Sequence, residues 1–102
     1  MNMDSLLREM AANAANTTQN GQELLREGVM NLLEQNRVTL EELMTALSEG
    51  EICEEEFSAE IEREKALLEA ELLSLQIVGK PEAQKAITAA MDTLTQAVKQ
   101  AI

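Results

Sequence analysis

Glutamate is the residue type best placed to do chemistry in this chain, because eight glutamates fall within a short central stretch. They are Glu49, Glu51, Glu54, Glu55, Glu56, Glu60, Glu62 and Glu64. Carboxylates at this density suit a surface that imitates DNA phosphates and occupies a basic protein, or a weak cation site. We expect no metal, because calcium loops need mostly Asp and Asn ligands at alternate positions around a glycine. A solvated helix face is the simplest interpretation. The candidates for binding a basic partner are Glu54, Glu55, Glu56 and Glu60.

Cys53 is the only thiol in the chain. A helix N-terminus stabilises a thiolate, which would make this side chain reactive. The neighbouring residues Glu51, Glu54, Glu55 and Glu56 oppose ionisation, because their negative charge disfavours a second anion. We therefore expect Cys53 to cap a helix or to pack, and a lone cysteine makes no disulfide within the chain.

Missing residue types restrict the function more sharply. The chain has no His, Tyr or Trp. Serine and cysteine triads lack their imidazole, structural zinc sites lack their ligands, and the Glu-x-x-His pairs of di-iron bundles cannot be built. We expect a protein that is not an enzyme and that needs no cofactor.

The formal net charge is -11, and the surplus lies in the middle of the chain. Residues 38–79 carry twelve acids and two bases. Phosphates and anionic lipids repel such a surface, so we expect no binding to nucleic acid or membranes. The sequence shows neither a charged-then-apolar leader nor an apolar run near the length of a membrane span, so the cytoplasm is the expected location.

The pattern of apolar residues predicts a single all-α domain over residues 1–102, built from four helical segments. The first segment starts at Asn2 or Asp4 and reaches Asn36, with a break or bend near 17–21 and a possible capping box at Asn20 and Glu23. Two alternatives remain for residues 1–20, a loosely packed N-terminal arm or a separate helix.

The second and third segments share one type of start. A short helix has Val38 before the cap, Thr39 as cap, Glu42 at the third position and Leu43 at the fourth, which is a capping box with a hydrophobic staple. Gly50 ends this helix in a left-handed conformation. The long third helix, residues 54–78, repeats the pattern with Ile52, Cys53, Glu56 and Phe57.

Pro81 is expected at the first position of the last helix, whose apolar face includes Ile87, Met91, Leu94 and Val98. The connection at residues 79–81 is short, so the third helix and the last helix should pack as an antiparallel hairpin. Their alanines permit close approach.

Residues 40–57 resemble the short C-terminal domain family of bacterial proteins, often written SHOCT. The resemblance lies in the Leu-rich short helix, the Gly50-x-Ile52 turn, the cap position at Cys53 and the pair Glu56-Phe57. It implies a helical hairpin that mediates oligomerisation or attachment to partners, with no catalytic residues. The chain departs from the family in three ways: a Cys replaces the usual capping Thr or Ser, the Leu67-Leu68 pair lies further along, and the segment is central.

These features together predict a structural or scaffolding protein that self-associates, most simply as a homodimer. The argument is that four slender helices cannot bury so many apolar faces alone. The expected shared core consists of Ile61, Leu68, Leu72, Leu75, Ile87, Met91, Leu94 and Val98. The alternative is an acidic helical binding module, or a small assembly chaperone, that acts on a basic or helical protein.

Overall fold

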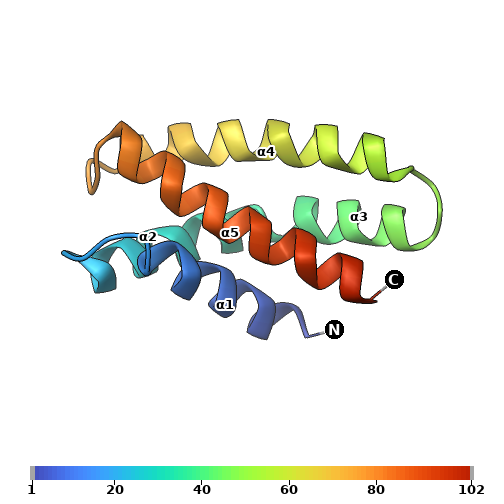
Figure 1. Cartoon of the computed structure of the whole chain (residues 1–102), viewed down its shortest axis with the longest axis horizontal. Coiled ribbons are helices and arrows are strands. Elements are labelled where there is room, and N and C mark those ends of the chain that lie inside the picture. Colours follow the sequence, from blue (N-terminus) through green and yellow to red (C-terminus); the bar gives the residue numbers. More distant parts are fainter. Residues whose placement is uncertain (1, 102) are drawn as a thin grey trace.

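The computed structural model describes residues 2–101, and all regular secondary structure in this range is α-helical. The helices are α1 (Met3–Ala15), α2 (Gln22–Gln35), α3 (Arg37–Ser48), α4 (Glu54–Ser74) and α5 (Lys80–Ala101), as Figure 1 shows. The all-α prediction is confirmed. The described part contains five helices rather than four, because the first expected segment divides into α1 and α2.

Residues 16–21 separate α1 from α2, at the position where the sequence predicted a break in the helix. Thr17 Oγ1 donates a hydrogen bond to the Ala14 carbonyl at 2.7 Å, and Thr18 Oγ1 donates to the Asn20 carbonyl at 3.1 Å. Such bonds compete with the helical pattern. The residue before α2 is Gly21, with φ of +72° and no side-chain cap. The expected capping box at Asn20 is therefore wrong.

Helix α1 is a separate, packed helix. Its start is capped as predicted, since Asn2 Oδ1 accepts a hydrogen bond from the Ser5 amide at 3.1 Å. Six of its 13 residues are buried, among them Leu7 and Met10 with no exposed surface. The two alternatives for residues 1–20 were a loosely packed arm and a separate helix, and residues 3–15 form a separate helix.

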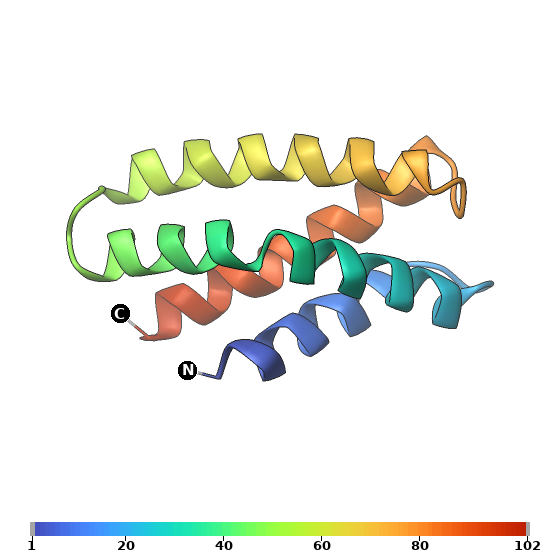
Figure 2. The ribbon, with the colours of Figure 1, turned by 180° about the vertical axis from the view of Figure 1, so that it is seen from behind.

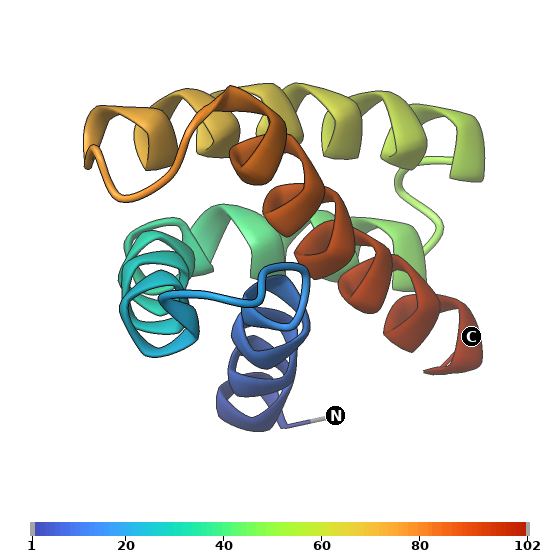
Figure 3. The ribbon, with the colours of Figure 1, turned by 60° about the vertical axis from the view of Figure 1, so that its left-hand side comes forward.

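The junction of α2 and α3 differs from the prediction. Helix α3 begins at Arg37, so Thr39 and Glu42 lie within the helix and Thr39 is no cap. Figure 2 shows α3 following directly after α2, and Figure 3 shows that the two helices meet at an angle. The Asn36 amide donates to the Leu32 carbonyl at 3.1 Å, and the Leu40 amide donates to the Asn36 carbonyl at 3.1 Å. The backbone only bends at Asn36, which leaves no free helix start to cap.

The predicted staple between Val38 and Leu43 is wrong for the same reason. Val38 is 68% exposed, whereas Leu43 is half-buried and packs against the core. Arg37 holds this end of α3 instead. Its guanidinium pairs with Glu41 at 2.8 Å and with Asp4 of α1.

The turn between α3 and α4 follows the prediction closely. Gly50 has φ of +75°. Its amide donates to the Leu47 carbonyl at 3.1 Å, and the Glu51 amide donates to the Ala46 carbonyl at 2.8 Å, which is the Schellman pattern. Cys53 and Glu56 form the expected capping box at the start of α4.

Phe57 is 4% exposed, and Ile52 is half-buried against the same core, so both apolar residues of the expected staple pack inward.

Helix α4 ends earlier than predicted, at Ser74 rather than near residue 78. The cause is Gln76, which has φ of +60° and donates its amide to the Leu73 carbonyl at 3.0 Å. Residues 75–79 form the connection. Lys80 is the first residue of α5 and Pro81 the second, one position later than expected.

Helices α4 and α5 run in opposite senses, but they cross at an angle instead of lying alongside one another (Figures 1 and 3). Helix α1 is the principal neighbour of α5. Small buried residues on both helices permit this close approach: Ala11 and Ala14 on α1, and Ala86 and Ala90 on α5. Asn13 Nδ2 also donates to Thr93 Oγ1 at 2.8 Å.

The single chain has the surface area of a compact monomer. Its accessible surface is 5972 Å², and a folded monomer of this mass has about 5,700 Å². The radius of gyration is 13.1 Å, close to the value of about 12.8 Å for a compact domain of this length. The described chain therefore buries most of its apolar residues without a second copy.

The left-handed residue Gln76 leads to a stability prediction. A side chain with Cβ strains this conformation, whereas glycine adopts it freely. We expect Gln76→Gly to stabilise the protein by about 1 kcal/mol in urea denaturation. The matched control is Gln96→Gly in the interior of α5, which should destabilise by about 1 kcal/mol. If Gln76→Gly and Gln96→Gly changed the free energy of unfolding equally, Gln76 would not be strained by its left-handed conformation.

Candidate functional site: the α4 surface

The four glutamates expected to bind a basic partner do not form one surface. Glu54, Glu55 and Glu56 are exposed in the first turn of α4, where consecutive residues point in different directions. The Glu56 carboxylate accepts the Cys53 amide at 3.0 Å, and this hydrogen bond lowers the pKa of Glu56. Glu60 is half-buried and pairs with Arg63 at 3.1 Å. Two of the four carboxylates, Glu56 and Glu60, thus already interact with groups of the same chain.

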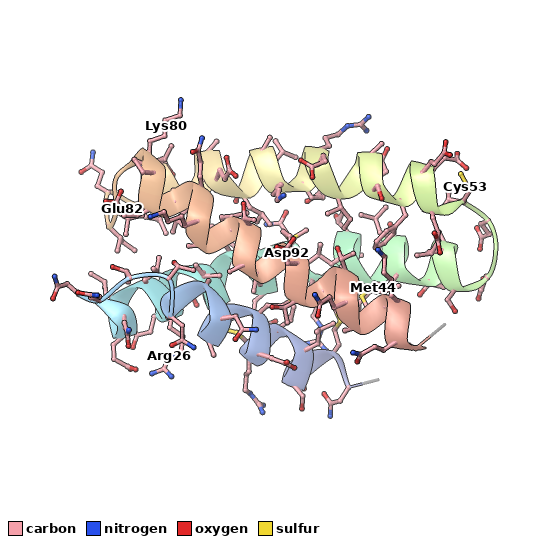
Figure 4. All side chains as sticks on the ribbon, viewed as in Figure 1. Arg26, Met44, Cys53, Lys80, Glu82 and Asp92 are labelled. Atoms are coloured by element: carbon pink, nitrogen blue, oxygen red, sulfur yellow. The ribbon has the colours of Figure 1, made fainter. Side chains whose placement is uncertain are left out.

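Cys53 lies exposed at the turn between α3 and α4 (Figure 4). Five glutamates lie within four residues of it in the sequence. Of these, Glu49 and Glu51 interact directly: a side-chain hydrogen bond to Glu49, together with its charge, raises the pKa of Glu51. Among residues 2–101, no three metal-binding side chains gather closely enough to hold an ion.

Glu64 is the residue whose environment the sequence analysis missed. It was counted in the solvated acidic run, yet only 8% of its surface is exposed, and its Oε2 atom is buried with no hydrogen-bond partner in the described chain. Burial raises the pKa of Glu64, and the nearby charges of Glu71 and Glu60 raise it further. Spacing was the available signal: Glu64 follows Ile61 by three positions and precedes Leu68 by four, which places it on the core face.

Glu64 also belongs to a second row of residues, at the edge of the core face. We call this row the Glu64 stripe, and it consists of Glu60, Glu64, Leu67, Glu71 and Leu75. Its members follow one another at intervals of three or four positions, so they lie along one side of the helix. Leu67 is 51% exposed and Leu75 is 45% exposed. The stripe therefore combines carboxylates with uncovered leucines.

Helix α2 borders the end of this stripe. A Cβ atom placed on Gly28 would lie 3.5 Å from Leu75 Cδ1 and 2.9 Å from Ile77 Cδ1, so the connection after α4 packs directly on the α2 backbone. Leu24, one turn before Gly28, is 57% exposed. The apolar end of the stripe thus lies beside α2.

The residues expected at an oligomer interface lie almost entirely inside one chain, which corrects the predicted site. Their exposures are Ile61 6%, Leu68 0%, Leu72 0%, Ile87 0%, Met91 0%, Leu94 0% and Val98 2%, whereas Leu75 is 45% exposed. Helices α1 and α2 supply the apolar faces that a second copy was expected to supply.

Several hollows mark the surface, and two of them have volumes near 450 Å³. One, of about 450 Å³, lies between α3, α4 and α5 and is lined by Leu47, Glu54, Phe57, Ser58, Thr95 and Lys99. Another, of about 440 Å³, lies between α1 and α2 and is lined by Arg8, Ala11, Ala12, Arg26, Glu27 and Met30. Neither hollow includes Glu64 or any other residue of the stripe.

Comparison of the chain with protein-family models, curated proteins and solved structures gave no match. The resemblance of residues 40–57 to the SHOCT family therefore stays a prediction. None of the helices within residues 2–101 combines the length and apolarity needed to cross a bilayer.

The burial of Glu64 predicts a pH-dependent gain in stability on replacement. We expect Glu64→Leu to stabilise the protein by about 1–3 kcal/mol at pH 7, because an unpaired buried carboxylate is replaced by an apolar side chain. The raised pKa means that the folded state keeps this proton at pH values where the unfolded chain has lost it. Wild-type stability therefore falls as pH rises above about 4.5, the usual pKa.

The advantage of Glu64→Leu should accordingly shrink as pH falls toward 4.5, and urea denaturation at pH 4 and pH 7 measures it. Glu62→Leu is the matched control, since Glu62 is exposed on the same helix. A destabilised Glu64→Leu variant at pH 7 would contradict the account of Glu64.

Proposed function

We propose that this protein is a non-enzymatic binding module that recognises a basic protein segment through the hairpin of α3 and α4. The observation that carries the proposal is the position of the acidic surplus. The exposed carboxylates of this hairpin are Glu41, Glu42, Glu49, Glu51, Glu54, Glu55, Glu56 and Glu62. Such a surface attracts cationic partners and speeds their encounter.

Charge also argues against nucleic acid as the partner, since phosphates would meet a chain of net charge -11. A basic protein segment is the complementary macromolecule. The proposal corresponds to the alternative function drawn from the sequence, but it relocates the surface from the first turn of α4 to the whole hairpin.

Charge reversal on two different helices tests the proposal. The probe is a synthetic 18-residue amphipathic helix with leucines on one face and lysines on the other, titrated at 0.15 M salt. We expect Glu42→Lys/Glu55→Lys to weaken binding at least tenfold, because it reverses exposed charges on both helices of the hairpin. The matched variant Glu82→Lys/Asp92→Lys changes the net charge equally on α5 (Figure 4), and binding should stay within twofold.

Circular dichroism checks that both variants fold. Equal weakening by both would mean that only net charge matters, and failure of the wild-type protein to bind the peptide would refute the proposed function.

Self-association is the second candidate, favoured by the four large apolar side chains that are exposed within residues 2–101: Leu24, Val38, Leu67 and Leu75. A stable interface buries about 800 Å² on each partner, and its centre is apolar. The repulsion between two copies of net charge -11 opposes it.

The two candidates differ in molecular mass. For the binding module we expect the monomer mass of 11.2 kDa in light scattering coupled to size exclusion. Concentration must come from refractive index, because the chain has no Trp or Tyr. A constant mass of twice that value would favour self-association, and Leu67→Glu/Leu75→Glu should then restore the monomer.

A further inference from the structure

The Glu64 stripe has the dimensions of a docking surface for one helix. From Glu60 to Leu75 it extends about 22 Å along α4, at the rise of a helix. Its two leucines are about half exposed, and its carboxylates lie at the first, second and fourth positions of the row. A surface of this pattern complements a helix that carries both apolar and cationic residues.

Glu64 is the residue that gives the stripe its specificity. A buried carboxylate oxygen without a partner is rare in native proteins and lowers their stability. Nothing in the fold requires the charge, since Ile61 and Leu68 on either side of it are ordinary core residues. A polar group that breaks the local pattern at a cost in stability is typical of a functional site.

No Lys or Arg of residues 2–101 hydrogen-bonds the buried Glu64 Oε2 atom, and the charge of Arg63 only partly offsets the raised pKa of Glu64. The two bases next to it in the sequence pair elsewhere: Arg63 pairs with Glu60 at 3.1 Å, and Lys65 pairs with Glu62 at 3.3 Å. The missing partner of Glu64 has to be a donor, and Glu60 and Glu71 favour one that carries positive charge. A Lys or Arg side chain is long enough to reach a carboxylate at the edge of a core face.

We propose that the Glu64 stripe binds an amphipathic helix of another protein, with a central Lys or Arg paired to Glu64 and apolar side chains on Leu67 and Leu75. This inference rests on the proposed function and names both the site and the partner chemistry. Among the exposed apolar residues, Leu24 lies near Arg26 and Val38 lies next to Arg37, but these arginines pair with acids of their own chain, Arg26 with Glu23 and Arg37 with Asp4 and Glu41. A second copy also has a net charge of -11, which the acidic stripe repels.

A double-mutant cycle tests the pairing. The probe is the 18-residue Leu/Lys helix with one additional lysine at the centre of its leucine face. A control peptide has norleucine in place of that central lysine. We expect Glu64→Gln to weaken binding of the central-lysine peptide at least tenfold and to change binding of the norleucine peptide less than twofold. Glu82→Gln, exposed on α5 and outside the hairpin, should leave both dissociation constants within twofold.

Urea denaturation of each variant separates binding from folding, because loss of binding by a variant at least as stable as the wild type cannot come from unfolding. Equal effects of Glu64→Gln on the two peptides would overturn the pairing while leaving the proposed function intact. If the wild type binds neither peptide, the proposed function fails instead. A dimer mass that Leu67→Glu reduces to the monomer would show that a second copy covers the stripe, and would also overturn the inference.

Discussion

The burial of α1 against α5 and α2 is the packing constraint on which the rest of the structure depends. Leu7 and Met10 of this short helix have no exposed surface, and α5 makes its main contact with α1 rather than with the preceding helix α4. Close approach through alanines makes that contact possible. Because α5 turns toward α1, α4 keeps one face in the core and the remainder of its surface uncovered (Figure 3).

The buried apolar residues and the surplus of acidic residues therefore lie mostly in different parts of the chain. Helices α1, α2 and α5 supply most of the buried apolar residues, whereas residues 38–79 carry twelve of the acids and only two bases. Glu64 is the exception, since it places an acidic group on the core face of α4. This overlap of charge with burial is the physical reason to place the proposed helix contact at Glu64.

Local chemistry predicted some helix ends and failed at others. The turn at Gly50 was predictable because left-handed glycine, the Cys53–Glu56 box and Phe57 act within a few residues of one another. Thr39 and Glu42 have the same spacing but lie within a helix, because the backbone at Asn36 bends without ending the hydrogen-bond pattern. A capping pattern permits a helix start and does not impose one.

The order of residues along the chain was sufficient to predict an all-helical protein, its interruption after α1 and its acidic centre, since these follow from short-range propensities and from composition. It also contained the spacing that places Glu64 beside Ile61 and Leu68. Which apolar faces meet was decided by the tertiary structure alone. Hydrophobic burial is non-directional, so the faces of Leu72, Met91 and Val98 suited a second copy as well as α1 and α2. Three-dimensional packing covered them within one chain and left Leu67 and Leu75 exposed.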